Sequence, residues 1–298
     1  MMALAAPSYT VPTRPTVRAR VEKRYADERS NLISRFEKAT SVSLTTDTWT
    51  SNSTESFITV TAHYLDAEWI LHSDVLMTRA MPERHTAENI AEFGLTGKVE
   101  CCVHDNARNI QKAGTLCPEW GDHSCFAHTL QLCIKPVLEL PSVSKPCNND
   151  TALVASMKTT LRDEMTERFQ PGRDETAESL PMIASLLDPR YKKLSFLPRQ
   201  LRRRTHTMLE GRLDDVPLKV SSRDDGDCAT PAKRPRLEFM VTSPESSMED
   251  DLQLYLAEKM DDAIPALELW RRNENRFPKV AHVARSVLAV PATSVPSE

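Results

Sequence analysis

The sequence of 298 residues predicts an α/β protein, in which a mixed sheet with helices is followed by a largely helical region. β-Branched and aromatic residues gather in short runs between residues 42 and 78, which is typical of strands. A fourth run of this kind covers residues 98–104, and the segments before and after it have the spacing of helices. Beyond residue 151 the apolar pattern is mainly helical.

The first predicted element is a helix over residues 16–38. Its apolar residues recur at three-, four- and seven-residue spacings with charges between them; they are Val17, Val21, Tyr25, Leu32, Ile33 and Phe36. Three strands follow at residues 42–49, 56–65 and 69–78. The polar turn at residues 51–54 favours an antiparallel meander.

Helices and a fourth strand alternate after this meander. Thr86 caps a predicted helix at residues 86–93, the fourth strand covers residues 98–104, and another helix begins at Asn106. The other predicted helices cover residues 125–138, 151–169, 175–187, 248–259, 264–275 and 278–288, and the basic residues near position 200 lie on a helix as well.

These elements divide the chain into five parts, of which one is a linker rich in Ser, Asp, Pro, Lys and Arg. The parts are a flexible N-terminus at residues 1–15, the first part of the core at 16–140, a helical region at 141–216, a disordered linker at 217–248 and a C-terminal helical region at 249–298.

The composition excludes several classes of protein. The formal net charge of -4 is not that of a uniformly basic nucleic-acid-binding protein, although residues 190–212 hold eight Lys or Arg residues and one acidic residue. Apolar runs are too short for a transmembrane helix, so no membrane association is expected. Glycine-rich phosphate loops are absent, and seven irregularly spaced cysteines favour a reducing compartment.

Four short segments carry the most specific information. They are residues 44–51 and 103–110, in each of which a β-prone run meets an aspartate, together with residues 125–130 and 291–298. In this order they resemble segments of hAT-family DDE transposases, of the branch that includes BED-finger proteins. The resemblance implies an RNase H-like core followed by a dimerisation region. We expect the chain to lack the BED finger and most of the helical insertion of that family.

Asp47 and Asp105 are the candidate catalytic residues. The resemblance implies that they lie at the ends of adjacent strands and bind Mg²⁺ or Mn²⁺, hard cations that prefer oxygen ligands. Glu298 matches the third carboxylate, and as the final residue it is expected to be poorly held. From the sequence alone, Asp47 could simply end a strand and Asp105 could cap a helix.

Cys125 and His128 form a second candidate site. Their spacing is compatible with zinc binding, although four ligands at a recognised spacing are not evident. The alternative is that Cys125 packs against the sheet. A Cys-His hydrolase with Cys125 as the nucleophile would need a carboxylate that orients the histidine, and the sequence shows no such pattern.

Basic and apolar residues in the second half suggest two binding surfaces. Phosphate contact with DNA is one role for the basic cluster, and a solvated helix face is the other; its residues are Arg199, Arg202, Arg203 and Arg204. The C-terminal apolar residues are either core or, as the resemblance implies, a dimerisation surface; they are Leu267, Trp270, Phe277, Val280 and Leu288. The basic run Lys233–Arg236 fits nuclear import.

The sequence therefore supports a nuclear, domesticated and catalytically inactive transposase relative, which needs no cofactor. It would bind DNA weakly in a salt-sensitive way, form a homodimer, or do both in transcriptional regulation. The alternatives are an active Mg²⁺- or Mn²⁺-dependent DNA transposase or nuclease, and a gene remnant without a folded function.

Overall fold

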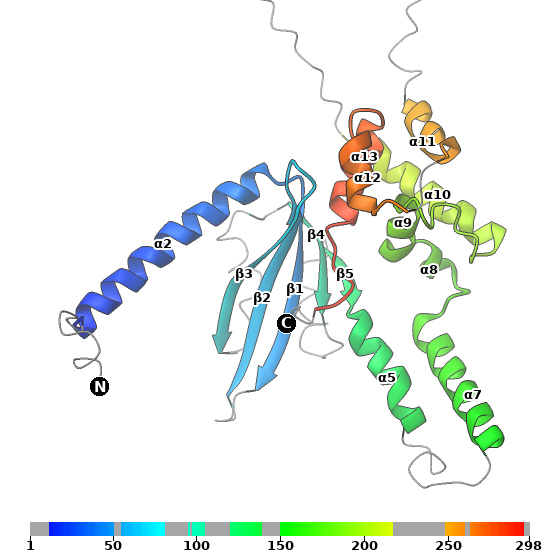
Figure 1. The fold of residues 1–298 in the computed structure, drawn as a ribbon, viewed down its shortest axis with the longest axis horizontal. Helices are drawn as coiled ribbons and strands as arrows, with labels where there is room; N and C mark the ends of the chain where they lie inside the picture. Colours follow the sequence, from blue (N-terminus) through cyan, green and yellow to red (C-terminus); the bar gives the residue numbers. More distant parts are fainter. Residues whose placement is uncertain are drawn as a thin grey trace, which may run out of the picture.

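The computed structural model describes residues 12–50, 55–80, 95, 97–104, 120–138, 150–216, 248–259 and 263–294. A central sheet carries one long helix on its left in Figure 1, and a group of helices lies at its upper right. The predicted helices at 86–93 and from Asn106, and almost all of the predicted linker, lie outside the described residues.

The sheet has the strand order β3-β2-β1-β4-β5. Its strands are β1 (Val42–Thr50), β2 (Ser56–Leu65), β3 (Leu71–Ala80), β4 (Val99–His104) and β5 (Gly121–Ser124). The first three strands pair antiparallel, which confirms the predicted meander, whereas β1 pairs with β4, and β4 with β5, in parallel. The sheet is therefore mixed, as the sequence predicts.

Strand β5 was not predicted from the sequence. Its residues Gly-Asp-His-Ser include no β-branched or large apolar side chain, so local propensity gives no strand signal. The strand forms because all four of its residues pair with Cys101–His104 of β4. Gly121 is required by this close approach, since a Cβ there would lie 2.8 Å from the carbonyl oxygen of Glu100.

Strand β1 lies in the middle of the sheet and is buried on both faces. Val42 and Leu44 pack on the side of Phe36, which belongs to helix α2 (Arg14–Lys38). On the opposite side of the neighbouring strand β4, Cys101 and Val103 contact Cys125. One core thus packs α2 against one face of the sheet, and the other places Cys125, the residue before α5 (Phe126–Leu138), against the opposite face.

Helix α2 forms where the spacing predicts it. The side-chain hydroxyl of Thr13 accepts a hydrogen bond from the backbone N–H of Thr16, and Pro15 lies in the first turn, where its missing N–H costs nothing. The helix packs on the sheet only near its end, because Phe36 is its one buried residue.

Two pairs of helices follow the sheet. Helices α5 and α7 (Asp150–Phe169) lie side by side (Figure 1), and the Phe126 and Phe169 ring centroids are 5.3 Å apart. The single helix predicted at 175–187 is two helices, α8 (Asp174–Ala177) and α9 (Leu180–Leu187). The break has a physical cause, because Pro181 has no N–H to continue α8 and is favourable only in the first turn of α9.

A single large core joins the remaining helices. It contains buried residues of α9, α10 (Arg199–Asp214), α11 (Met248–Ala257), α12 (Ala266–Asn273) and α13 (Pro278–Val287). Helix ends are satisfied across this core: the Tyr255 hydroxyl donates to the carbonyl oxygen of Leu186 at 3.0 Å, and the Trp270 indole donates to that of Leu187 at 2.9 Å. Of the helices described, none has the length and apolar character to span a bilayer.

Candidate functional site

Asp47 lies near the C-terminal end of β1, with its side chain half-buried. It pairs with Thr59 of β2, and the residue before it, Thr46, pairs with His104 of β4. Because side chains alternate along a strand, Asp47 shares a sheet face with Thr45. Asp47 is thus the one predicted catalytic residue that the structure describes.

His104 ends β4 beside Thr46 and is buried, with 3% of its surface exposed. Its Nε2 is hydrogen-bonded to the carboxylate of Asp122 in β5, and its carbonyl oxygen accepts from the backbone N–H of Cys125 at 2.7 Å. Asp105 is joined to His104 by one peptide bond and lies outside the described residues. The parallel pairing therefore leads β1 and β4 to the same end of the sheet, one residue before each aspartate.

The sheet face shared with Asp47 is lined by hydroxyl groups. Thr45 and Ser73 hydrogen-bond the two ring nitrogens of His63, each at 2.9 Å, and Thr59 and Thr78 share a hydrogen bond of 3.1 Å. Burial lowers the pKa of His63 to about 4, so this histidine is neutral at pH 7. The face therefore gains no positive charge from His63.

The C-terminal residues 290–294, here called the C-terminal strap, return to the sheet after α13. The carbonyl oxygen of Ala292 accepts from the N–H of Phe126 at 2.9 Å, and the N–H of Ser294 donates to the Cys125 sulfur at 3.4 Å. The Thr293 hydroxyl lies 3.2 Å from the same sulfur. The strap is thereby held next to the end of β4, and Glu298, four residues beyond Ser294, lies outside the described residues.

Cys125 holds the strap with a buried thiol. Burial alone would raise the pKa of this thiol, but hydrogen bonds from the Thr293 hydroxyl and from the backbone N–H groups of His128 and Ser294 lower it to about 7. Cys125 also packs with Cys101 and Val103, which confirms the predicted packing role. Among the described residues, no three His, Cys, Asp or Glu side chains are grouped as a metal site requires.

The strap is expected to be held more tightly at high pH. The folded pKa of Cys125 is depressed from 9.0 to about 7, so its stabilising effect is fully present above pH 9 and is lost as the pH falls through 7. Proteolysis within residues 290–294 should therefore be slower at pH 9 than at pH 6. Each rate is divided by the rate on a peptide substrate at the same pH, which corrects for the pH dependence of the protease. The Cys125→Ser variant should lose this difference, and an unchanged pH dependence in that variant would contradict the assignment.

The predicted DNA-binding arginines lie on α10 in different environments. Arg204 forms ion pairs with Asp174 at 2.9 Å and Glu178 at 3.0 Å, and Arg202 is half-buried. Arg199 and Arg203 are exposed. The helix thus offers two of the four arginines freely to a ligand, and phosphate contact stays a prediction.

The predicted dimerisation residues belong to the helical core of the chain itself. Trp270, Phe277 and Val280 are fully buried, and Leu267 and Leu288 are partly buried against the same cluster. The apolar spacing therefore corresponds to a core, which is the first of the two interpretations given for these residues. Whether these residues also support a dimer stays a prediction.

Sequence reasoning missed a joint between the sheet and the C-terminal helices. The β2–β3 turn places Trp69 in the helical core, where its indole donates to Glu274 at 2.8 Å. Arg285 of α13 bonds the same glutamate at 2.8 Å, binds the carbonyl oxygens of Asp66 and Ala67, and lies 4.2 Å from the Trp69 ring centroid. The sequence signal for this joint was a tryptophan within a polar turn, and the structure places that residue in a left-handed conformation (φ 63°).

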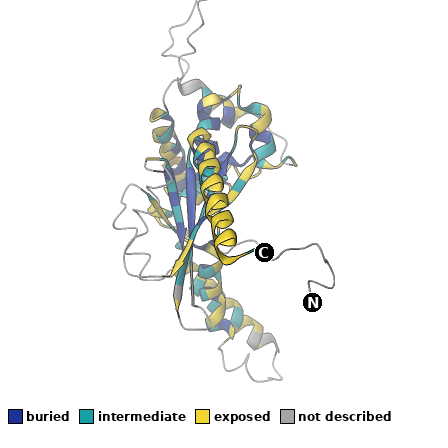
Figure 2. Cartoon of the chain, turned by 90° about the vertical axis from the view of Figure 1, so that its left-hand side faces the viewer, coloured by how far each residue is buried: buried dark blue, intermediate teal, exposed yellow. Residues whose placement is uncertain are grey.

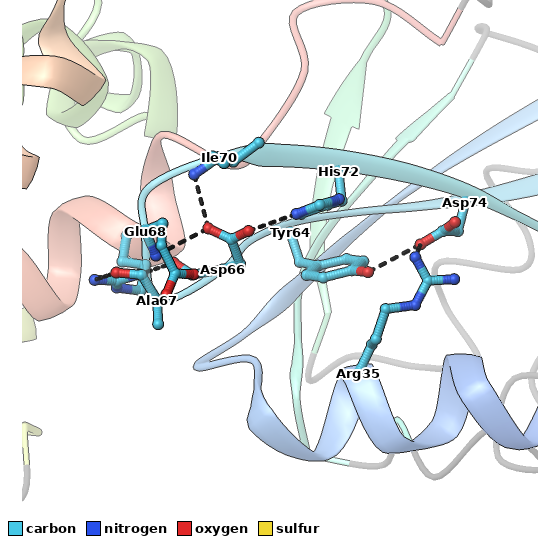
Figure 3. A network of polar contacts seen from close by, with 9 residues as sticks. Arg35, Tyr64, Asp66, Ala67, Glu68, Ile70, His72 and Asp74 are labelled. Carbon is cyan, nitrogen blue, oxygen red and sulfur yellow. Dashed lines mark hydrogen bonds and ion pairs between the residues drawn. The ribbon is translucent and has the colours of Figure 1, made fainter.

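A polar network continues from this joint along β2 and β3 to α2 (Figure 3). Asp66 accepts from the N–H groups of Glu68 and Ile70 and bonds His72 at 2.7 Å. Burial would raise the pKa of Asp66, but these hydrogen bonds lower it overall. The network shapes the turn that carries Trp69.

At the other end of the network, the Tyr64 hydroxyl donates to Asp74, which pairs with Arg35 of α2 at 3.2 Å. Burial and the nearby Asp74 raise the pKa of Tyr64 to about 12. These contacts fasten α2 to β3.

Two family models match parts of the chain. A model of the ZBED1 RNase-like domain matches residues 45–119, and a model of the hAT family C-terminal dimerisation region matches residues 244–298. The first match contains β1 to β4 from Thr45 onward, and the second contains α11, α12 and α13.

Two curated proteins of Zea mays are also similar, named "Putative AC transposase" and "Putative AC9 transposase". Each is 28% identical over 87 residues, which is 29% of this chain. The matched segment spans 11% of the first relative and 10% of the second, so the chain covers only a small part of either. Together, the mixed sheet, the helical C-terminal region and these similarities support a ZBED-like protein of the hAT transposase family.

Proposed function

We propose that this hAT-family protein acts in the nucleus as a DNA-binding, self-associating regulator of transcription, without strand-transfer activity. The observation that carries the proposal is the packing of the matched dimerisation region. Its helices share one core with α9 and α10, and Arg285, Glu274 and Trp69 fasten that core to the sheet. A dimer formed through this region would hold two RNase H-like sheets in a fixed relation.

Self-association is supported by the family match over residues 244–298. Because Trp270 and Phe277 are buried within the chain, a second subunit would contact outward-facing residues of the same helices, of which Leu254 is 55% exposed. A homodimer is also the commonest form of a soluble oligomer.

The purified chain is expected to elute with the mass of a dimer when gel filtration is combined with light scattering. Leu254→Glu should shift the protein toward the monomer, because it places a charge on an apolar contact surface. Leu254→Met is the matched control and should leave the mass unchanged. A monomer mass for the wild type at all concentrations up to about 100 μM would contradict self-association, since stable homodimers have dissociation constants well below this range.

DNA binding is supported by exposed basic side chains such as Arg199 and Arg203 on α10. They provide local positive charge, although the net charge of the chain is -4. Contacts of this kind reach phosphates rather than bases, so binding should be weak, tolerant of sequence and sensitive to salt. Binding to duplex DNA that persists unchanged between about 50 and 200 mM salt would contradict this mode.

Nuclear localisation is supported by the basic run Lys233–Arg236, which lies outside the described residues. A fluorescent fusion of the chain is expected to accumulate in nuclei, and replacement of Lys233, Arg234 and Arg236 by alanine should redistribute it. A wild-type fusion excluded from nuclei would remove this part of the proposal.

Strand transfer is the second candidate function, and one observation favours it. The pairing of Thr46 with His104 and the strap at Cys125 bring Asp47, and the segments that lead to Asp105 and Glu298, toward one end of the sheet. Of the three carboxylates, however, the described residues supply Asp47 alone, and they contain no grouped metal ligands.

Nicking of supercoiled DNA in Mn²⁺ distinguishes the two candidates. The wild type and the variants Asp47→Ala and Asp105→Ala are expected to show the same background level of nicks. Nicking by the wild type that disappears in both variants would establish metal-dependent cleavage and overturn the catalytically silent assignment.

A further inference from the structure

The N-terminal half of α2 stands apart from the rest of the chain. Every residue from Arg14 to Glu28 is exposed, a length of about 22 Å at 1.5 Å per residue. In Figure 2 the helix faces the viewer and is coloured almost entirely as exposed. Its contacts with the sheet are made near its C-terminal end, by Phe36 and by the Arg35–Asp74 ion pair.

This exposed half is strongly basic. Residues 14–24 contain five basic residues and a single acidic residue, Glu22; the basic residues are Arg14, Arg18, Arg20, Lys23 and Arg24. The chain as a whole has a net charge of -4, so this segment differs in sign from the whole chain, as does the basic stretch at residues 190–212. Such a segment is the electrostatic footprint of a polyanion-binding surface.

The spacing arranges the arginines in two rows. Arg14 and Arg18 are four residues apart and form one row, and Arg20 and Arg24 form another, because residues i and i+4 are neighbours on a helix surface. At about 100° per residue, Val17 and Val21 project between the two rows. A helix with basic side chains on both flanks fits the major groove, whose walls are the two phosphate backbones.

These charges are available to a ligand. Arg18 contacts Glu22 at 2.7 Å and Arg24 contacts Glu28 at 3.8 Å, but both pairs are solvent-exposed and contribute little. A guanidinium group has five N–H donors, so each arginine keeps donors for a phosphate. Arg14, Arg20 and Lys23 have no acidic partner among the residues that the structure describes.

The basic face of α10 compares poorly with that of α2. Arg204 pairs with both Asp174 and Glu178, with 42% of its side chain exposed against 80% for Arg18 and 83% for Arg24, and Arg212 is bound to Glu100. Arg199 and Arg203 remain exposed, which gives two exposed basic residues outside these ion pairs, against Arg14, Arg20 and Lys23 on the first turns of α2. The structure therefore favours α2 over α10 as the stronger phosphate-binding helix.

We infer that residues 14–24 of α2 form a contact surface for the phosphate backbone of duplex DNA. The inference rests on the proposed DNA-binding function and names the element that carries it. A lipid surface is disfavoured, because a membrane-bound helix needs a broad apolar face opposite its charges. Here the apolar stripe of Val17, Val21 and Tyr25 is narrow, and Arg14 and Arg18 project beside it. A second copy of α2 is disfavoured because it would bring the two basic segments together.

The test uses the full chain and a short fluorescein-labelled duplex of arbitrary sequence, followed by fluorescence anisotropy over about 50 to 200 mM KCl. One triple variant carries Arg14→Gln, Arg20→Gln and Lys23→Gln. The comparison variant, here called the α10 control, carries Lys193→Gln, Arg199→Gln and Arg203→Gln, which removes the same charge from the competing basic surface formed by α10 and by Lys193 just before it. Glutamine keeps helix propensity, so both variants should fold like the wild type, which circular dichroism checks.

The α2 variant is expected to bind at least about tenfold more weakly, and the slope of log K against log salt should fall by roughly 2 to 3, close to 0.9 per lost contact. The α10 control should lose less than about threefold, and Glu22→Gln should bind more tightly than the wild type.

Three outcomes would overturn the inference. A loss confined to the α10 control would place the DNA contact on α10 and leave the proposed function standing. Binding of the wild type to phosphatidylserine vesicles but not to the duplex would assign α2 to a membrane surface. Failure of the wild type to bind any duplex at low salt would remove both the inference and the DNA-binding part of the proposed function.

Discussion

Replacing Trp270 by alanine is expected to destabilise the protein by about 3–5 kcal/mol, the usual cost of removing a large aromatic side chain from a core. Trp270 is fully buried, and its ring centroid lies 5.0 Å from that of Tyr255 and 6.2 Å from that of Trp69. Its indole also satisfies the carbonyl oxygen of Leu187 at the end of α9. The substitution would leave both a cavity and an unpaired buried carbonyl group.

Chemical denaturation followed by far-ultraviolet circular dichroism measures this loss. Trp270→Phe keeps most of the packing but not the hydrogen bond, so we expect a loss of about 1–2 kcal/mol. Arg272→Gln, on the exposed side of the same helix, should change stability by less than about 0.5 kcal/mol. If the free energy of unfolding of Trp270→Ala lies within about 1 kcal/mol of that of the wild type, the core around Trp270 does not hold the C-terminal region.

Replacing Arg285 by alanine is expected to separate the C-terminal helices from the sheet. This guanidinium joins two carbonyl oxygens of the β2–β3 turn to Glu274, and it covers the Trp69 ring. Removal of one partner of a buried ion pair costs about 3–5 kcal/mol. Glu274 is 43% exposed and therefore partly screened, so we expect about 2–3 kcal/mol here.

A melt of the Arg285→Ala variant should show two transitions where the wild type shows one, because the joint couples the sheet to the helical core. Arg285→Lys keeps the charge but cannot bridge three acceptors in the same geometry, so it should restore only part of the coupling. Glu274→Gln should weaken the coupling less than Arg285→Ala does, because glutamine retains a hydrogen-bond acceptor. A single transition at the wild-type temperature in Arg285→Ala would show that Arg285 does not couple the two parts.

Both substitutions act on contacts between distant parts of the chain. Trp270 and Leu187 are 83 residues apart in the sequence, and Arg285 and Asp66 are 219 residues apart. These contacts make one folded unit of an N-terminal sheet and a C-terminal helical region. The arrangement explains how a dimer formed through the C-terminal region would also position the sheets.

The elements with strong local patterns could be predicted from the sequence. Alternating β-branched runs gave the antiparallel meander, and helical spacing gave α2, α5, α7 and the C-terminal helices. The burial of Trp270 and Phe277 follows from the same spacing. The candidate site was predicted less completely: the structure places Asp47 at the expected strand end, whereas Asp105 and Glu298 lie outside the described residues.

The α/β class, the order of the main elements and the apolar faces could be predicted from the amino-acid sequence, because periodicity and propensity act within a few residues of each other. The pairing of β5, the insertion of Trp69 between the C-terminal helices and the contact of Cys125 with the strap were seen first in the folded chain. So was the exposure of the basic half of α2. These features depend on which distant segments meet, and no local pattern encodes such a meeting.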